Sequence, residues 1–166
     1  MITLYHAFTK PEALKKVNER LAARTATIRP LVVVIDGSRR ELAPTPKDPC
    51  SVGGFKIKTL WGMLAHRLGA YAKVMHLDGL DAPPPFTDVL MSVLKEPNRP
   101  VLIMVDEMLP HIYTVSRAEG LRGYAENLIM FMGYLARAVE RTPGVALLVS
   151  LQMERRGDQI IEEETY

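Results

Sequence analysis

Three short apolar segments constrain the fold of this 166-residue chain more than any other feature. They are LVVVID at 31–36, VLIMVD at 101–106 and VALLVSL at 145–151. Each is continuously apolar until its end, as is typical of strands that are buried on both faces of a sheet. Segments with helical periodicity separate them. We therefore expect an α/β protein with three layers, α/β/α, and a mainly parallel sheet.

Apolar residues recur at intervals of three and four in the segments before and between the strands. The spacing predicts a helix over 10–24, with Thr9 placed to cap it. A second helix is predicted to follow Thr59, and a short one to span residues 86–94. Residues 121–141 carry the longest helical repeat and predict the longest helix.

The composition is that of a soluble globular protein, with 48% hydrophobic and 24% charged residues. No apolar run approaches the roughly 18 residues that cross a bilayer, so no membrane partner is expected. The net charge of +2 does not by itself support a nucleic-acid partner. One cysteine cannot form an internal disulfide, and the cytoplasm is the expected location. We expect one domain over 1–152 and a polar, acidic tail over 153–166.

Acidic residues stand where the first two apolar segments end. Asp36 closes the first segment, and Asp106 and Glu107 close the second. Ligands of open parallel sheets bind at the carboxyl ends of the strands, so these residues are candidates for a site. An acid at a strand end can hold Mg²⁺, and a carboxylate one residue further on can deprotonate an attacking water. The plainer interpretation is that Asp106 caps the following turn and Glu107 is solvated.

A site that hydrolyses a nucleoside triphosphate also needs a glycine-rich loop that ends in Gly-Lys-Ser/Thr. The nearest match is SVGGFKIKTLWG at 51–62, where isoleucine and not glycine precedes the lysine. It overlaps a stretch over 43–54 that is rich in proline and glycine and is expected to be a loop. Instead of a phosphate loop, we expect Gly53 and Gly54 to be turn residues and Thr59 to be a helix cap.

Three segments resemble a family of large P-loop ATPases: ITLYHAFTKPEAL at 2–14, TLWGMLAHRLGAY at 59–71 and RPVLIMVDEMLPHIY at 99–113. The family is domain of unknown function 499, within the broad AAA-type group, and the resemblance covers most of residues 1–152. It implies that the Gly-Lys-Thr of the phosphate loop lies a few residues before position 1. The expected fold is then a partial P-loop NTPase core that lacks the phosphate-loop strand.

The resemblance also implies roles for the residues that match the family pattern. Asp106 would hold Mg²⁺, Glu107 would be the hydrolytic base, and Ser150 would be the polar sensor at the tip of the third strand. The implied cofactors are Mg²⁺ and ATP, and the implied function is the Walker B half-site of an ATP-hydrolysing enzyme. Without the lysine of the phosphate loop, we expect weak or absent ATP binding and negligible turnover by this chain alone.

The family further implies a strand order in which 101–106 lies between 31–36 and 145–151. The outer edge of the 145–151 strand would then lack its neighbour, and a bare apolar edge invites pairing with another chain. We therefore expect a homo-oligomer that forms through this strand edge. The tail segment DQIIEEET at 158–165 is a candidate cover or added strand.

Two other functions remain open at this stage. Asp36, Asp106 and Glu107 could share a metal in a Mg²⁺-dependent nuclease or phosphohydrolase, because adjacent parallel strands lie about 4.8 Å apart. Against this, no second acid stands two residues after Asp36. Alternatively, the chain is a non-catalytic assembly module. The basic pair Arg39–Arg40, which follows the first strand, is expected to be solvated.

Overall fold

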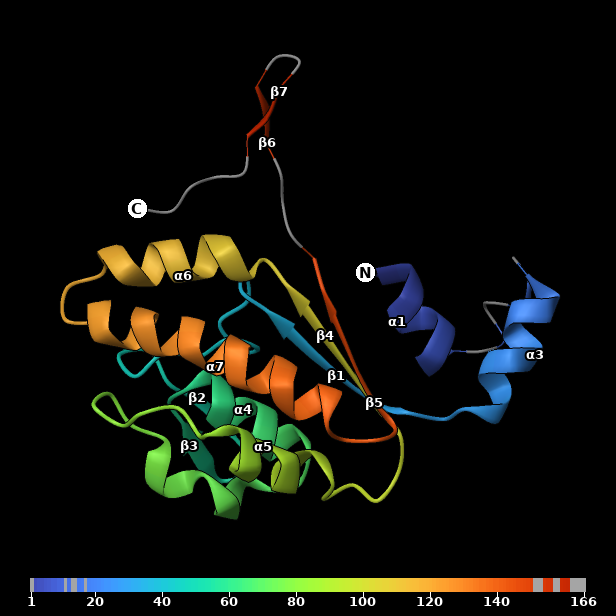
Figure 1. Cartoon of the computed structure of the whole chain (residues 1–166), viewed down its shortest axis with the longest axis horizontal. Helices are drawn as coiled ribbons and strands as arrows, with labels where there is room; N and C mark the ends of the chain where they lie inside the picture. The colour runs from blue at the N-terminus through green and yellow to red at the C-terminus, as the bar shows by residue number, and fades with distance from the viewer. Residues whose placement is uncertain are drawn as a thin grey trace.

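The computed structural model describes residues 2–10, 12, 15, 16, 18–150, 154–156 and 159–161 (Figure 1). Its main sheet has three parallel strands, β1 (Leu31–Asp36), β4 (Val101–Asp106) and β5 (Val145–Val149), in the order β1-β4-β5. The predicted strands, their parallel arrangement and the central position of 101–106 are therefore confirmed. The third strand ends at Val149, two residues before the predicted end.

The three strands are paired without stagger. Leu31 lies opposite Val101, and Asp36 lies opposite Asp106. On the other side of β4, Val101 lies opposite Val145 and Val105 opposite Val149. The carboxyl ends of all three strands therefore reach the same level, where the polar residues that follow them come together.

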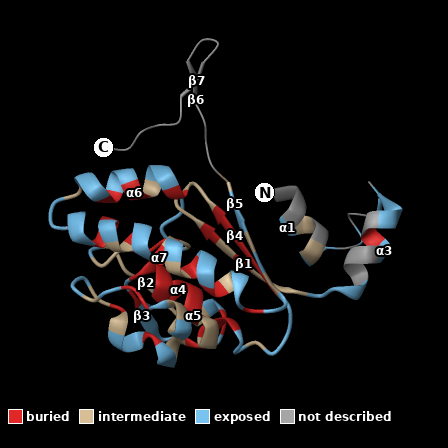
Figure 2. Cartoon of the chain, in the orientation of Figure 1, coloured by how far each residue is buried: buried red, intermediate tan, exposed pale blue. Residues whose placement is uncertain are grey.

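Four helices form a layer on one face of the sheet (Figure 1): α4 (Leu60–Arg67), α5 (Thr87–Leu94), α6 (Met108–Arg117) and α7 (Arg122–Glu140). Their inner sides and this face of the sheet form the buried core (Figure 2). Its largest fully buried side chains include Trp61, Tyr124, Phe131, Ile35, Leu60, Leu64, Leu90, Leu94 and Ile103. Burial of these side chains is the main source of stability of the domain.

The predicted helices after Thr59, over 86–94 and over 121–141 correspond to α4, α5 and α7, with Phe86 as the N-cap of α5. Helix α6 was not expected from the sequence. It contains Pro110, but this proline lies in the first turn, where no intrahelical N–H bond is lost. A helix can therefore begin directly after the Asp106–Glu107 pair.

The single helix predicted over 10–24 is wrong. The structure has α1 (Ile2–Thr9) and α3 (Glu19–Thr27), and Lys10 and Asn18 are not helical. Thr9 does not cap a following helix, because its hydroxyl donates to the Tyr5 carbonyl at 2.7 Å, one turn back in α1. Residues 11, 13, 14 and 17 of the predicted helix lie outside the described part of the chain.

The stretch predicted as a loop over 43–54 contains one strand of a hairpin formed by β2 (Cys50–Val52) and β3 (Phe55–Ile57). Gly53 and Gly54 make its turn with φ values of +58° and +82°, a conformation that glycine adopts without strain. The expectation that these glycines are turn residues is confirmed. They do not form a phosphate-binding loop.

Asp78 is a buried carboxylate that organises the start of α4. It is only 6% exposed and accepts hydrogen bonds from the Lys58 N–H at 3.1 Å, the Thr59 hydroxyl at 2.6 Å and the Tyr71 hydroxyl at 2.7 Å. The Thr59 oxygen accepts from the Gly62 N–H, so Thr59 is the N-cap that the sequence predicted. A negative charge at a helix N-terminus is stabilising. Burial, with the neighbouring Asp78 charge, raises the pKa of Tyr71.

Near the C-terminus, β6 (Glu154–Arg156) and β7 (Gln159–Ile161) pair with each other in a separate antiparallel sheet. The described part of the tail therefore does not extend the β1-β4-β5 sheet, contrary to the expectation of an added strand. Two segments separated by so few residues close a hairpin at a small cost in loop entropy. Residues 157, 158 and 162–166 lie outside the described residues. Within the described chain, no helix has the length and apolar character to cross a membrane.

Candidate functional site

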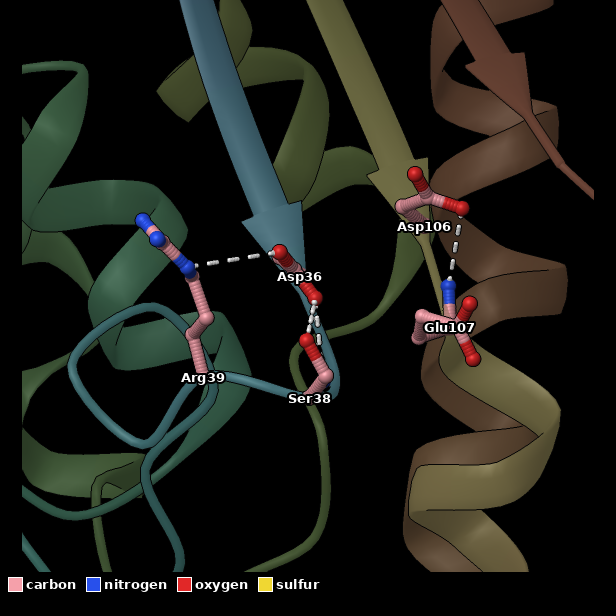
Figure 3. A network of polar contacts seen from close by, with 5 residues as sticks. All are labelled: Asp36, Ser38, Arg39, Asp106 and Glu107. Atoms are coloured by element: carbon pink, nitrogen blue, oxygen red, sulfur yellow. Dashed lines mark hydrogen bonds and ion pairs between the residues drawn. The ribbon is translucent and has the colours of Figure 1, made fainter. Parts of the chain in front are cut away.

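The predicted site residues meet at the carboxyl edge of the sheet. Asp36 is the last residue of β1 and Asp106 the last of β4, and the two are paired in register. Glu107 follows Asp106 directly, and Ser150 follows the end of β5. Figure 3 shows the two aspartates at the tips of neighbouring strands and Glu107 at the start of α6. The level ends of the strands bring these four residues together.

Asp106 is fixed by hydrogen bonds from two directions. Its Oδ1 accepts from the Glu107 N–H at 3.1 Å and from the Ser150 hydroxyl. The Ser150 N–H in turn donates to the Val105 carbonyl at 2.9 Å, which continues the β4–β5 pairing past the end of the strand. Among the described residues, no hydrogen bond or ion pair involves Oδ2. One carboxylate oxygen is thus anchored, while the other is available to a cation or to its water shell.

Glu107 occupies an unusual backbone conformation. Its φ of +53° and ψ of +30° are left-handed, a region that costs a residue with a side chain about 1–2 kcal/mol. It is the N-cap residue of α6, although its side chain does not cap the helix. Figure 3 shows its carboxylate beside the first turn of α6, apart from that of Asp106. The left-handed backbone of Glu107 therefore places its carboxylate away from that of the preceding residue, Asp106.

Gly37 and His111 hold this turn against the end of β1. The Gly37 N–H donates to the Asp106 carbonyl at 2.9 Å, and a Cβ atom on Gly37 would lie 2.2 Å from the Glu107 carbonyl oxygen. His111 donates its backbone N–H to that same carbonyl at 3.2 Å. Its Nδ1 lies 3.2 Å from the Gly37 carbonyl oxygen, which accepts only if Nδ1 carries the proton. Only a residue without a side chain fits at position 37.

Burial lowers the pKa of His111, and the hydrogen bond to Gly37 opposes this shift. The imidazole is therefore neutral at pH 7, with the proton on Nδ1 and a lone pair on Nε2. In the described chain, Nε2 is buried and has no hydrogen-bond partner. Sequence reasoning missed both Gly37 and His111. A glycine directly after a strand-end acid was the only available signal of a close backbone approach.

Asp36 has partners of its own. Its Oδ1 accepts from the Ser38 N–H at 3.0 Å and the Ser38 hydroxyl at 2.6 Å, and its Oδ2 lies 3.8 Å from Arg39 Nε (Figure 3). The second residue of the basic pair, Arg40, forms an ion pair with Asp48 at 2.6 Å. Both arginine side chains remain more than half exposed. The expectation of a solvated basic pair is confirmed, with each charge also paired to a local acid.

At this edge, the Asp106 carboxylate offers one oxygen that could bind a magnesium ion. The described residues contain no cluster of three or more His, Cys, Asp or Glu side chains that could hold a metal. Magnesium, however, keeps several waters and is often bound by one or two carboxylates together with substrate phosphates, which Asp106 can satisfy. None of the eleven glycines in the sequence is followed by lysine, so no Gly-Lys-Ser/Thr loop is present.

These features define an α/β domain with a parallel sheet and an acidic carboxyl edge. A family model described as the DUF499 N-terminal domain matches residues 1–166, so the chain belongs to this family. Comparison with curated proteins and with solved structures gave no match.

Proposed function

We propose that this domain is the magnesium-binding and water-activating half of an ATP-hydrolysing site. The observation that supports the proposal is the hydrogen bond from the Ser150 hydroxyl to the Asp106 carboxylate, at the level tips of adjacent parallel strands. Such a bond joins the acid at one strand end to a polar residue at the next. The resemblance to AAA-type ATPases implies the roles of the three residues, and the family match covers residues 1–166 without giving an activity.

Each residue has one role in the proposed site. Asp106 would hold Mg²⁺ through its second carboxylate oxygen, directly or by way of water. When bound, the metal neutralises the charge on the phosphates. Glu107, turned away from Asp106 by its left-handed backbone, would orient and deprotonate the attacking water. Ser150 holds Asp106 in place, and it would act as a sensor by turning its one hydroxyl hydrogen from Asp106 to the terminal phosphate.

This half-site is idle in the chain alone. Without a Gly-Lys-Ser/Thr loop, no lysine neutralises the β- and γ-phosphates, and no row of glycine N–H groups cradles them. A phosphate loop would therefore have to come from a segment outside these 166 residues. Negligible ATP turnover by these 166 residues is the expected result.

Metal binding tests the proposal on the chain as it is. Mn²⁺ can replace Mg²⁺, and its free concentration can be followed by electron paramagnetic resonance. We expect Asp106→Asn to lower the Mn²⁺ affinity about tenfold or more, because a carboxylate ligand becomes a neutral amide. Unchanged affinity in Asp106→Asn contradicts the assignment.

Hydrolysis is the second test. A protein in which this domain is joined to a Gly-Lys-Thr phosphate loop should hydrolyse ATP, and Glu107→Gln should abolish this activity. Conversely, turnover by the 166-residue chain alone that Glu107→Gln abolishes would contradict the proposal that the half-site is idle.

A Mg²⁺-dependent nuclease or phosphohydrolase is the second candidate function. The register of Asp36 opposite Asp106 favours it, because two carboxylates on adjacent strands can bind one metal. The local partners of Asp36, Ser38 and Arg39, oppose it. Asp36→Asn separates the two functions. If the chain is a nuclease, Asp36→Asn lowers the Mn²⁺ affinity and abolishes cleavage of single-stranded DNA. If the chain is an ATPase half-site, Asp36→Asn changes neither the Mn²⁺ affinity nor the ATP turnover of a protein that also has the phosphate loop.

We further propose that the chain associates with a second copy through β5. This strand is one of the two edge strands of the main sheet among the described residues, and its Leu148 and Val149 are 38% and 36% exposed. A long, apolar and unpaired edge is a template for pairing. If a stable dimer forms and Asp106→Asn leaves Mn²⁺ binding unchanged, the chain is a non-catalytic assembly module instead of a half-site.

A further inference from the structure

The exposed ring of Phe55 belongs to a cluster of three aromatic side chains. Phe55 begins β3, His66 lies near the end of α4, and Tyr71 begins the short 3-10 helix η1 (Tyr71–Lys73). The Phe55 ring centroid lies 5.1 Å from that of Tyr71 and 5.9 Å from that of His66, in both cases edge to face. Phe55 is nevertheless 48% exposed. Contacts with two rings hold it in place while it remains open to solvent.

The β2–β3 hairpin that carries Phe55 is anchored to the rest of the domain. Ile57, two residues after Phe55, is fully buried. At the turn, a Cβ atom on Gly53 would lie 3.2 Å from His66 Nε2, so the turn backbone lies against the imidazole. Phe55 is therefore presented by a rigid support, and a ligand that binds to its ring has little conformational freedom to remove.

The part of the chain that forms this cluster is cationic. Residues 49–77 contain no aspartate or glutamate, and they have four basic side chains: Lys56, Lys58, Arg67 and Lys73. Lys73 forms an ion pair with Glu96 at 2.8 Å. The other three are exposed, and none of them forms an ion pair within the part of the chain that the structure describes. Three positive charges therefore remain without a paired acid and attract anions.

Two of these cations directly follow ring residues. Lys56 follows Phe55 and Arg67 follows His66, so each cation has its Cα about 3.8 Å from that of a ring residue. Lys56 points to the side of β3 opposite Phe55, because successive strand residues alternate. A polyanion that contacts the Phe55 ring therefore lies close to positive charges from both β3 and α4.

A second exposed phenylalanine has the opposite charge environment. Phe86 is 60% exposed, and its ring centroid lies 5.4 Å from that of Tyr134. Residues 78–94, which include Phe86, contain three aspartates and no lysine or arginine. The domain thus has one exposed ring among cations and another among acids. Only the ring among cations suits an anionic ligand.

We propose that single-stranded nucleic acid binds to the Phe55 surface, which we define as Phe55, His66 and Tyr71 together with Lys56, Lys58 and Arg67. A base would stack on the Phe55 ring, and the three cations would contact phosphates of the adjacent nucleotides. Proteins that hold unpaired nucleotides without reading their sequence combine exposed aromatic rings with positive charges in this way. Anionic lipid is a poorer partner, because one exposed ring adds little apolar area to insert into a membrane.

Fluorescence anisotropy of the full chain with a labelled oligothymidine of about 12 nucleotides tests the inference. At low salt, we expect saturable binding with a Kd of about 10–100 μM. An oligomer of the same length with abasic sugars has the same phosphates but no bases, so it should bind about tenfold more weakly. Equal affinity for the two oligomers would reduce the surface to a simple anion site and overturn the inference. Binding to phosphatidylserine vesicles without binding to oligothymidine would also overturn it.

Substitution of the two exposed phenylalanines tests the role of stacking. Phe55→Ala should weaken oligothymidine binding about tenfold and leave the abasic oligomer unchanged. Phe86→Ala is the matched control and should change neither affinity, because Phe86 lies among aspartates. Equal losses in the two variants contradict the assignment. In Phe55→Trp, the new indole should keep the affinity, and its fluorescence should be quenched when a base stacks on it. Bound oligothymidine without quenching also contradicts stacking at position 55.

The salt dependence tests the cations. One lost phosphate contact lowers the slope of log affinity against log salt concentration by about 0.7 for a single strand, and this change is expected for Lys56→Gln. Arg141→Gln is the control, because Arg141 is exposed and lies outside residues 49–77. An unchanged slope in Lys56→Gln contradicts the phosphate contact. All titrations are made in EDTA, so their outcome does not depend on the proposed metal site at Asp106.

Discussion

The Ser150 hydroxyl donates a hydrogen bond to the Asp106 carboxylate, which joins the ends of β5 and β4. Both side chains are half-buried, so the bond is only partly screened by water. Ser150→Ala should lower the free energy of unfolding by about 1 kcal/mol. Chemical denaturation measures this loss. Ser116→Ala is a suitable control, because the Ser116 hydroxyl is exposed and donates only to the Tyr113 carbonyl. Equal losses of unfolding free energy in the two variants would mean that the hydrogen bond to Asp106 stabilises the protein no more than an exposed hydrogen bond does.

Gly37 is the position where a single methyl group should be most damaging. An alanine Cβ would lie 2.2 Å from the Glu107 carbonyl oxygen and 2.6 Å from His111 Cβ. The contact partner is backbone, so β1 must shift relative to α6, and Gly37→Ala should cost about 2–3 kcal/mol. In Gly133→Ala, by contrast, the new Cβ meets nothing within 4 Å on α7, and a stability gain of about 0.5–1 kcal/mol is expected. Thermal unfolding of both variants tests the pair, and a neutral Gly37→Ala would refute the close approach.

The main sheet was predictable because each of its strands is a continuous apolar run, which determines both its burial and its parallel pairing. The position of Asp36 and Asp106 at the same edge of the sheet followed from this parallel pairing. The contacts of Gly37 and His111 were not predictable, since they join residues 74 positions apart through a backbone approach that no local pattern records. The α1–α3 region was wrongly predicted because the Thr9 hydroxyl bonds backward to Tyr5 and not forward.

His111 should make the stability depend on pH. Burial lowers the pKa of His111 in the folded protein below its ordinary value of 6.5. The unfolded chain therefore binds more protons between the two pKa values, and stability rises with pH across this window. As the pH falls, the contribution of His111 to stability starts to decrease below about pH 6.5. It is lost once the pH is below the pKa of His111 in the folded protein. Urea denaturation between pH 7.5 and 5 measures the slope.

The matching variant is His111→Asn, because the asparagine amide nitrogen can replace Nδ1 as donor to the Gly37 carbonyl. Carboxylates that titrate in the same range remain in both proteins, so the difference between the two slopes isolates the imidazole. The slope should be shallower in the variant below pH 6.5. Parallel slopes would show that the histidine does not contribute to acid sensitivity.

Asp78 should be the acidic residue that contributes most to stability, although it lies outside the candidate site. Asp78→Ala leaves the donors of Lys58, Thr59 and Tyr71 without their acceptor, in a place that is nearly closed to water. A loss of about 3 kcal/mol is expected. The exposed Asp81 in the same segment is the control, and Asp81→Ala should change stability by less than about 0.5 kcal/mol. Similar losses in both variants would contradict the role of Asp78 as the anchor of α4.

Because the outer edge of β5 is unpaired among the described residues, we expect the chain to form a dimer as the protein concentration rises. A charged side chain on an edge strand opposes pairing with another edge, so Leu148→Lys should shift a dimer toward monomer. Light scattering over a range of protein concentrations measures the shift. Ile129→Lys is the matched control, because Ile129 is 60% exposed but lies on helix α7 and not on a strand. If both variants dissociate the dimer equally, general surface hydrophobicity and not the strand edge drives association. If the original chain is monomeric at every concentration, the proposed pairing through β5 is wrong.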